Sequence, residues 1–267
     1  MAEPPFSRVA VVGNGLIGAS IRHAARRAWP GVEPVTLDAG DDLGAIAGID
    51  LVVLAAPVRA NIALIDAIQP QLSRATVVTD TGSTKRATCA AAGKHPSMDF
   101  IGGHPMAGSA KGGAAYARAD LFDGRPWILT PTPGNPAGAV ARLEAWVAGL
   151  GAVPHVMTPE LHDRFVGAVS HLPQLTASAL MHVVGKLAGD AGLEIAGAGL
   201  LDTTRLATSP PDIWKDVAAT NEDVLREALD QLIRTLTDLR DTLATGDALD
   251  AVFTSACRWR TTLDRSR

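Results

Sequence analysis

Polar side chains that could take part in chemistry gather in three short segments of this sequence. These are residues 80–85 (DTGSTK) with Ser83, residues 103–108 (GHPMAG) with His104, and residues 170–174 (SHLPQ) with His171 and Gln174. An imidazole titrates near neutral pH, so it can accept a proton from a hydroxyl group. A lone histidine more often only packs in a core. At a predicted strand end and in the company of the other segments, His104 is better explained by a role in chemistry.

A glycine-rich turn lies upstream of these segments. The turn follows a predicted strand at 9–12 and opens a predicted helix. It consists of Gly13, Asn14, Gly15, Leu16, Ile17 and Gly18. Gly13 permits the tight turn, Gly15 lets a pyrophosphate approach the backbone, and Gly18 lets helix and strand pack closely. Free N–H groups at the helix N-terminus favour a bound phosphate. The strand before and the helix after make this pattern typical of dinucleotide binding.

Asp38 indicates which dinucleotide binds. It stands about twenty residues beyond Gly18, at the end of the predicted strand 35–37, where a carboxylate can accept hydrogen bonds from both ribose hydroxyls. Its charge would repel a 2′-phosphate and no arginine follows it closely, so we predict NAD rather than NADP. Ala56 and Pro57 end another strand at the same edge. We expect them on the nicotinamide side, although a plain strand-to-helix turn fits them equally.

The first half of the chain alternates apolar runs with Ala-rich helical segments, which predicts a parallel sheet covered by helices. The strands are expected at residues 9–12, 35–37, 51–54, 76–79, 100–101 and 127–129. Residues 130–136 hold three prolines and therefore form a loop, which leads into a helix over 137–150. This pattern indicates an α/β Rossmann-type domain over residues 1–155 that binds the cofactor.

The second half of the chain has helical periodicity almost throughout. Its apolar residues recur at helical spacing most clearly over 212–243, and Pro173 is expected to kink or end a helix. We therefore predict an all-α domain over residues 156–267 that carries substrate and dimerisation surfaces. Its long apolar stripes have little of its own surface to cover them, which favours a homodimer over core packing alone.

Together these motifs resemble the prephenate/arogenate dehydrogenase family of tyrosine biosynthesis. The resemblance extends from about residue 9 to residue 215 and includes residues 202–207 (DTTRLA), followed by 210–214 (PPDIW). It implies NAD-dependent oxidative decarboxylation of prephenate to 4-hydroxyphenylpyruvate, in which a ring carbon loses hydride, its hydroxyl loses a proton and the ring carboxylate leaves as carbon dioxide. Arogenate, alone or together with prephenate, is the alternative substrate.

The resemblance also assigns roles to single residues. It makes His104 the catalytic histidine that takes the hydroxyl proton, and Ser83 the serine beside the same hydroxyl. Ser83 could equally cap the helix that follows it. Arg205 matches an arginine that binds a substrate carboxylate, and a salt bridge to Asp202 or Asp212 is the alternative role. The remaining matches are His171 with Asp163 as its partner, Gln174, and Trp214, which would close the cleft or pack in the dimer.

The sequence departs from the family pattern at three places. Gln174 stands where many relatives carry a second histidine, so the preference between prephenate and arogenate as substrate stays open. Ala110 stands where relatives often have an acid, so we expect no ionic gate there. Residues 39–48 are too few for the helix and strand that usually precede 51–54, so we expect a more open adenine pocket.

Composition bears on the remaining classes of protein. A net charge of -4 without a basic cluster speaks against nucleic acid and anionic membranes as partners, and no apolar run is long enough to span a bilayer. Cys89 and Cys257 lie far apart without metal-ligand or redox spacing, so we expect no metal site and a cytoplasmic location. Another two-domain NAD enzyme, such as a β-hydroxyacid dehydrogenase or imino-acid reductase, would not need residues 103–108. A non-enzymatic NAD sensor would not need every catalytic residue type.

Overall fold

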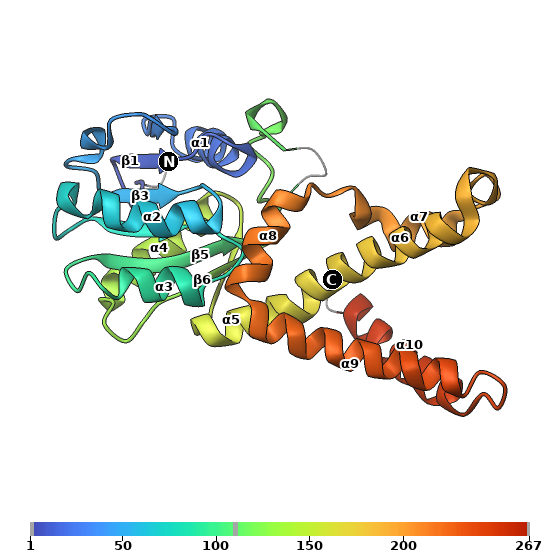
Figure 1. Cartoon of the computed structure of the whole chain (residues 1–267). Helices are drawn as coiled ribbons and strands as arrows, with labels where there is room; N and C mark the ends of the chain where they lie inside the picture. Colours follow the sequence, from blue (N-terminus) through green and yellow to red (C-terminus); the bar gives the residue numbers. More distant parts are fainter. Residues whose placement is uncertain (1–2, 109–111, 266–267) are drawn as a thin grey trace. The chain divides into compact units, whose positions relative to one another are not determined.

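The structure, a computed structural model, describes residues 3–108 and 112–265 (Figure 1). Its described part contains a seven-stranded sheet of order β2-β1-β3-β4-β5-β6-β7. The strands are β1 (Val9–Val12), β2 (Val35–Leu37), β3 (Leu51–Leu54), β4 (Val77–Asp80), β5 (Asp99–Pro105), β6 (Pro126–Thr130) and β7 (Val153–Val156). All six predicted strands are present, and the predicted α/β class is confirmed.

The predicted parallel sheet has one exception in its described part, β6, which runs antiparallel to β5. The described part of the chain between them holds only a short 3-10 turn, η3 (Ala114–Tyr116), so it returns from the end at which β5 stops instead of crossing over. β7 pairs parallel to β6 and was not predicted. The sequence did not indicate β7 because it contains Pro154 and most of its side chains are exposed. A proline is tolerated in this strand because β7 lies at the edge of the sheet.

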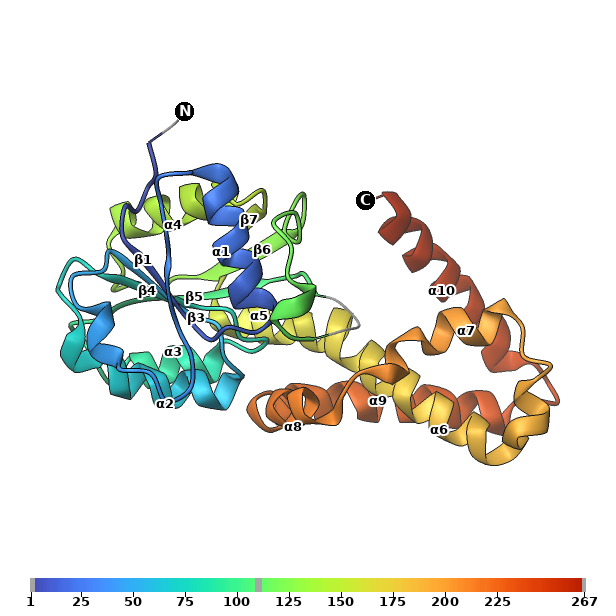
Figure 2. The same ribbon diagram turned by 90° about the horizontal axis from the view of Figure 1, so that it is seen from above.

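Helices cover both faces of the sheet (Figures 1 and 2). On one face α1 (Leu16–Ala28) and α4 (Ala137–Gly149) pack on Val9 and Val11. On the other, α2 (Val58–Ile68) and α3 (Arg86–Ala92) pack on Ala10 and Val12. Because side chains alternate between the two faces and both are covered, the strands read as unbroken apolar runs.

Residues 39–48 contain no α-helix. A single 3-10 turn, η1 (Leu43–Ile46), occupies this segment, and the Asp42 side chain caps it by accepting a hydrogen bond from the Gly44 N–H. The expectation that this segment is too short for a helix is confirmed, whereas the more open adenine pocket stays a prediction.

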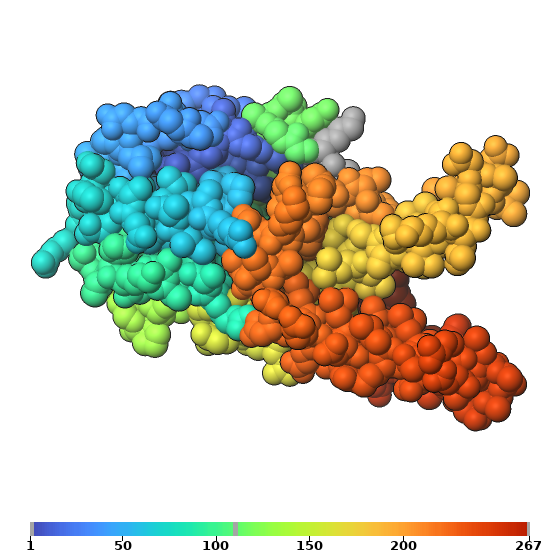
Figure 3. Space-filling view, in the orientation of Figure 1, coloured from blue at the N-terminus to red at the C-terminus, as the bar shows by residue number. Residues whose placement is uncertain are grey.

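The second half of the chain is helical, as predicted. It contains α5 (Pro159–Val166), the π-helical turn η4 (Gly167–His171), α6 (Leu172–Leu193), α7 (Ala198–Thr204), the 3-10 turn η5 (Arg205–Thr208), α8 (Pro211–Thr220), α9 (Glu222–Asp241) and α10 (Asp247–Arg265). Figure 3 shows α8, in orange, against α2, in cyan, where Arg59 and Asp216 form an ion pair of 3.6 Å. No helix in the described ranges is long and apolar enough to cross a membrane.

One detail of the helical half differs from expectation. The apolar stripe over 212–243 is not one helix, because the backbone leaves helical geometry at Asn221 (φ -138, ψ 32), whose side chain is buried. Pro173 lies in the first turn of α6, directly after the π-helical turn η4 ends at His171, so a helical segment ends just before this proline, as expected.

By internal contacts the chain forms two compact units, residues 1–222 and residues 223–267. All residues predicted to bind cofactor or substrate belong to the first unit. The predicted domain boundary between residues 155 and 156 stays a prediction; β7 ends one residue beyond it, at Val156.

Candidate active site

The glycine turn between β1 and α1 depends on the absence of side chains. Gly13 has a φ of 110°, and a Cβ there would come within 2.6 Å of the Ala55 carbonyl oxygen. A Cβ on Gly18 would overlap the Gly13 carbonyl oxygen, whereas nothing lies within 4 Å of a Cβ on Gly15. Gly13 and Gly18 therefore close the turn, and the backbone at Gly15 is open to a ligand.

The residues around this turn fit a dinucleotide. The Asn14 side-chain oxygen is buried without a hydrogen-bond partner among the described residues, and the first N–H groups of α1 have no partner within the helix. Beside the turn lies a cavity of about 470 Å³ lined by Gly13, Asp38, Leu43, Ala56, Pro57 and the alanines of α2. Asp38 accepts a hydrogen bond of 2.9 Å from the Ala39 N–H with one carboxylate oxygen. The arrangement suits an adenosine ribose and a pyrophosphate.

A second cleft, of about 360 Å³, connects this turn with the helical half of the chain. Its lining includes Gly15, Leu16 and Ile17 of the turn, Ala56 and Pro57, Ser83, and Pro210, Ile213, Asp216 and Val217 near α8. Of the predicted catalytic and substrate residues, only Ser83 lines this cleft directly.

The segment that carries Ser83 is fixed by a buried ion pair. The Lys85 ammonium contacts the Asp80 carboxylate, and both side chains are fully buried. Asp80 accepts hydrogen bonds of 3.0 Å from the N–H groups of Gly82 and Gly103, and Lys85 donates one of 2.6 Å to the Gly103 carbonyl oxygen. The pair therefore ties the loop after β4 to the end of β5, one residue before His104.

Ser83 does not cap a helix, so that expectation was wrong. α3 begins at Arg86, and its N-terminus has no side-chain cap. Ser83 is half-buried and forms no hydrogen bond with a described residue, His104 included. Its hydroxyl group is therefore available to the cleft.

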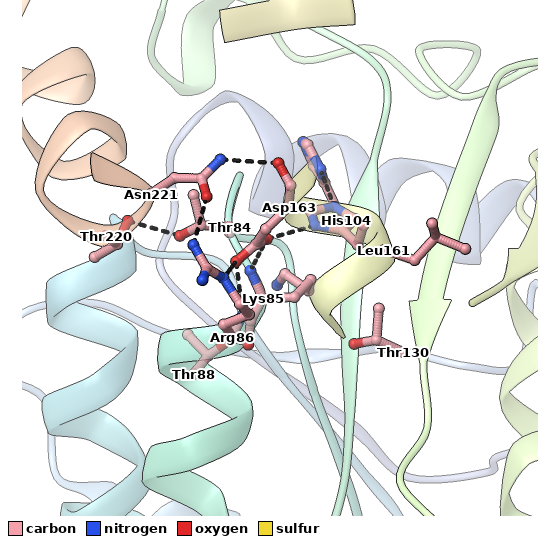
Figure 4. A network of polar contacts seen from close by, with 12 residues as sticks. Thr84, Lys85, Arg86, Thr88, His104, Thr130, Leu161, Asp163, Thr220 and Asn221 are labelled. Atoms are coloured by element: carbon pink, nitrogen blue, oxygen red, sulfur yellow. Dashed lines mark hydrogen bonds and ion pairs between the residues drawn. The ribbon is translucent and has the colours of Figure 1, made fainter. Parts of the chain in front are cut away.

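His104 lies near the end of β5 and is buried. Its Nδ1 is 2.8 Å from Nε2 of His162, and Nδ1 of His162 is 2.7 Å from the Asp163 carboxylate. Figure 4 shows Asp163 surrounded by Lys85, Arg86 and Asn221. The expectation that Asp163 supports His171 was wrong, because its carboxylate instead supports His162.

The protonation of this group follows from its surroundings. Burial, and then the charges of His162, Lys85 and His171, hold the pKa of His104 well below its ordinary value. Burial also lowers the pKa of His162, against the opposing hydrogen bond to Asp163. Burial raises the pKa of Asp163, but hydrogen bonds from His162 and from the N–H groups of Arg86 and Lys85 outweigh it, so this pKa is lowered. At neutral pH the imidazoles of His104 and His162 are therefore neutral, and the Asp163 carboxylate that His162 contacts is ionised.

His171 lies on the other side of the same network. The Asn221 side-chain amide donates a hydrogen bond of 2.9 Å to the Asp163 carbonyl oxygen, and its nitrogen is 3.5 Å from Nδ1 of His171. The Trp214 ring packs edge-on against His171 at 5.9 Å between centroids. Burial lowers the pKa of His171 to about 4, and its Nε2 is buried without a partner among the described residues.

Gln174 connects this network to the segment that carries Arg205. Its amide donates 2.8 Å to the Leu206 carbonyl oxygen and accepts 3.1 Å from the Ser209 hydroxyl. Arg205 itself is exposed and forms no hydrogen bond or ion pair with the described residues, so the alternative of a salt bridge to Asp202 or Asp212 is wrong. Ala110 lies outside the described residues.

The comparison with known sequences decides the family. Residues 16–156 match the model of the prephenate dehydrogenase nucleotide-binding domain, and residues 158–254 match that of the prephenate dehydrogenase dimerization domain. The chain belongs to the prephenate dehydrogenase family.

Curated members of the prephenate dehydrogenase family align with most of the chain. The prephenate dehydrogenase of Bacillus subtilis is 31% identical, over 90% of this chain and 71% of that protein. A cyclohexadienyl dehydrogenase of Zymomonas mobilis is 30% identical, over 91% of this chain and 90% of that protein. Among solved structures, the A. aeolicus prephenate dehydrogenase in complex with hydroxyphenyl propionate and NAD+ superposes with a TM-score of 0.84, at 25% identity, over 98% of this chain and 99% of that one.

Sequence reasoning missed several buried residues of this prephenate dehydrogenase family member. Asp80 and Lys85 lie in a segment that the motifs had singled out, but nothing local indicated that they form a buried pair. His162 stands directly before Asp163, and this His-Asp dipeptide was the available signal. Asn221 lies within the apolar stripe over 212–243 and carried no signal.

Proposed function

We propose that this chain catalyses the NAD-dependent oxidative decarboxylation of prephenate to 4-hydroxyphenylpyruvate. The observation that supports it most is a neutral, buried histidine, His104, at the carboxyl edge of a nucleotide-binding sheet in a member of this family. A neutral imidazole can take the proton of the substrate hydroxyl group. The side-chain hydroxyl of Ser83 is available and would hold the substrate hydroxyl in place by a hydrogen bond.

The cofactor side of the proposal rests on the turn and on Asp38. Gly13, Asn14, Gly15, Leu16, Ile17 and Gly18 would hold the pyrophosphate, Asp38 the adenosine ribose, and Ala56 with Pro57 the nicotinamide side. NAD, when bound, supplies the acceptor for the hydride that leaves the substrate ring. The Asp38 carboxylate would disfavour the 2′-phosphate of NADP.

The helical half would hold the anionic substrate. Arg205 is exposed and without a partner among the described residues, so its guanidinium group is free to pair with a substrate carboxylate. His171 has an unpartnered buried Nε2 that can donate a hydrogen bond. Gln174 and Trp214 would shape the site around them.

A second substrate is favoured by one observation. The Zymomonas mobilis relative is a cyclohexadienyl dehydrogenase, and Gln174 presents a neutral amide near the expected position of the substrate side chain. We therefore keep arogenate, as a further or alternative substrate, within the proposal.

We also propose that the protein is a cytoplasmic homodimer. The match to a dimerization domain supports pairing, as do large apolar side chains of α9 and α10 that are more than half exposed. Both cysteines are free, Cys89 buried and Cys257 exposed, which suits a reducing compartment.

One experiment tests the proposed reaction. Purified protein is mixed with prephenate or arogenate, each with NAD or NADP, and reduced cofactor and carbon dioxide are measured together. We expect both products in equal amounts with prephenate and NAD, and much slower turnover with NADP. Reduction of NAD without carbon dioxide would indicate another two-domain dehydrogenase, and no turnover with either substrate would refute the proposal.

A further inference from the structure

The hydrogen bonds around Asp163 determine what its carboxylate can do. One carboxylate oxygen accepts a hydrogen bond of 2.7 Å from the Lys85 N–H. The other accepts hydrogen bonds of 3.0 Å from the Arg86 N–H and of 3.2 Å from the Arg86 side chain. Every one of these partners is a donor. An Asp163 that accepts from this many donors is an ionised carboxylate with no proton of its own to give.

This fixes the protons on the two histidines in turn. Because Asp163 can only accept, Nδ1 of His162 must carry the hydrogen of their 2.7 Å contact. A neutral His162 then has a bare Nε2, which accepts from Nδ1–H of His104 across 2.8 Å. A neutral His104 protonated on Nδ1 has a bare Nε2. That Nε2 forms no hydrogen bond with the described residues, so its lone pair is free for a substrate.

We infer that His162 is a positioning residue which, held by Asp163, keeps His104 in the tautomer whose Nε2 is the proton acceptor. The inference rests on the proposed function, because it explains how His104 is made ready for that reaction. In the step itself the substrate O–H bond breaks, an N–H bond forms on Nε2 of His104, and the electron pair stays on the substrate oxygen. Nδ1–H continues to donate to His162, and the Asp163 carboxylate offsets the new positive charge through it.

The geometry argues for orientation rather than packing alone. The rings of His104 and His162 are tilted by 63° with centroids 5.1 Å apart, so they meet through their nitrogen atoms and not by stacking. Asp163 and His162 are both fully buried, and Asp163 is held by the first residues of α3, so the chain of hydrogen bonds has a rigid origin. The His104 ring cannot turn over without losing its partner.

The tautomer can be read directly by nitrogen NMR of protein labelled with ¹⁵N-histidine, with resonances assigned by the loss of one histidine at a time. We expect His104 to show a protonated Nδ1 and an unprotonated Nε2. A His104 signal with protonated Nε2 would overturn the inference. Because this measurement does not depend on turnover, it is separate from a failure of the proposed reaction.

Two variants of His162 complete the test. H162L removes the acceptor, and we expect kcat for prephenate to fall about 10- to 100-fold, with His104 losing its single tautomer. H162Q can still place an amide oxygen near Nδ1 of His104, as an acceptor for Nδ1–H, so it should retain the tautomer and most of kcat even if H162L does not fold. Equal losses of kcat in both variants with an unchanged His104 spectrum would mean that His162 only packs, and would overturn the inference.

A matched control exists elsewhere on the first compact unit. His95 forms a 2.6 Å contact with Asp66, another histidine–aspartate pair, but Asp66 is largely exposed and neither side chain forms a hydrogen bond or ion pair with a described residue of the site. H95L and H95Q should leave kcat and the His104 spectrum unchanged. If they change kcat as much as the His162 variants do, the effect is not specific to the site and the inference fails.

Discussion

At the scale of single residues, the most important is His104, whose surroundings keep its imidazole neutral. Burial comes first in lowering the pKa of His104, followed by His162, Lys85 and His171, the titratable groups that face it. A base with a depressed pKa is active while neutral and is lost only when the pH falls through that lowered value. An ordinary imidazole would instead lose activity near pH ~6.5.

We therefore expect kcat/KM for prephenate to stay flat from neutral pH through mild acid, and to decline only at lower pH. Initial rates across this range, corrected for protein stability, measure it. A fall of kcat/KM centred near pH ~6.5 would contradict the depressed pKa of His104.

Loss of the His104 base should appear in kcat rather than in binding. For H104N we expect kcat to fall by about 10²–10⁴ with little change in KM for prephenate, because the variant binds the substrate but cannot take its proton. Steady-state kinetics measure both constants. Turnover equal to that of the unchanged protein would remove His104 from the mechanism.

Gln174 affects the substrate through the segment of Arg205. Its amide holds η5 by hydrogen bonds to Leu206 and Ser209, so Q174L should free that segment and raise KM for prephenate about 10-fold, the direction also expected for R205A. T203A, which removes only an exposed bond within α7, is the control. A change in kcat alone would assign Gln174 to the chemical step instead.

At the scale of elements, β5 can carry His104 only because it lies very close to β4. A Cβ on Gly103 would come within 2.5 Å of the Asp80 carbonyl oxygen and 2.7 Å of the Thr79 hydroxyl. G103A must push β5 from β4 and displace both the Lys85 contact and the neighbouring His104.

We expect G103A to lower the free energy of unfolding by about 1–3 kcal/mol and to reduce kcat as well. Urea unfolding and steady-state kinetics measure the two effects. G31A, at an exposed glycine with nothing within 4 Å of its added Cβ, should change neither. If G103A is as stable and active as G31A, the close approach of the strands does not constrain the site.

At the scale of the molecule, the same buried histidines link stability to pH. Burial lowers the pKa of His104, His162 and His171, the last to about 4, whereas in the unfolded chain each takes a proton near pH ~6.5. Below that pH the unfolded state binds protons that the native state does not. Stability is therefore complete above about pH 6.5 and declines as the pH falls.

The expected loss is at most about 1.4 kcal/mol per histidine for each pH unit, between about pH 6.5 and the lowered pKa of that histidine in the native protein. Denaturant titrations at neutral pH and in mild acid measure the slope. H104N should have a shallower slope, by one group. A free energy of unfolding that is constant over this range would show that these histidines are protonated in the native protein.

The proposed dimer makes a prediction for the second compact unit. Phe253 of α10 is 66% exposed. A large apolar side chain is unfavourable in contact with water, so its exposure indicates a surface that a partner covers. If this surface is an interface, F253D should reduce the mass in solution from dimer to monomer, as measured by light scattering, whereas T254D on the same helix should not. A dimeric F253D would place the interface elsewhere.

The sequence by itself determined the features that repeat locally. The glycine turn, the buried strands and Asp38 at a strand end could all be found because each depends on neighbouring residues, on periodicity and on backbone freedom. His104 could be singled out in the same way, from its place at a strand end. Only the tertiary structure decided which groups stand behind it. His104 and His162 are 58 residues apart, and Asp163 supports His162 rather than His171 because of how α5 packs beside α3. Hydrogen bonds between distant elements and the charges they bury follow from packing, which no local pattern records.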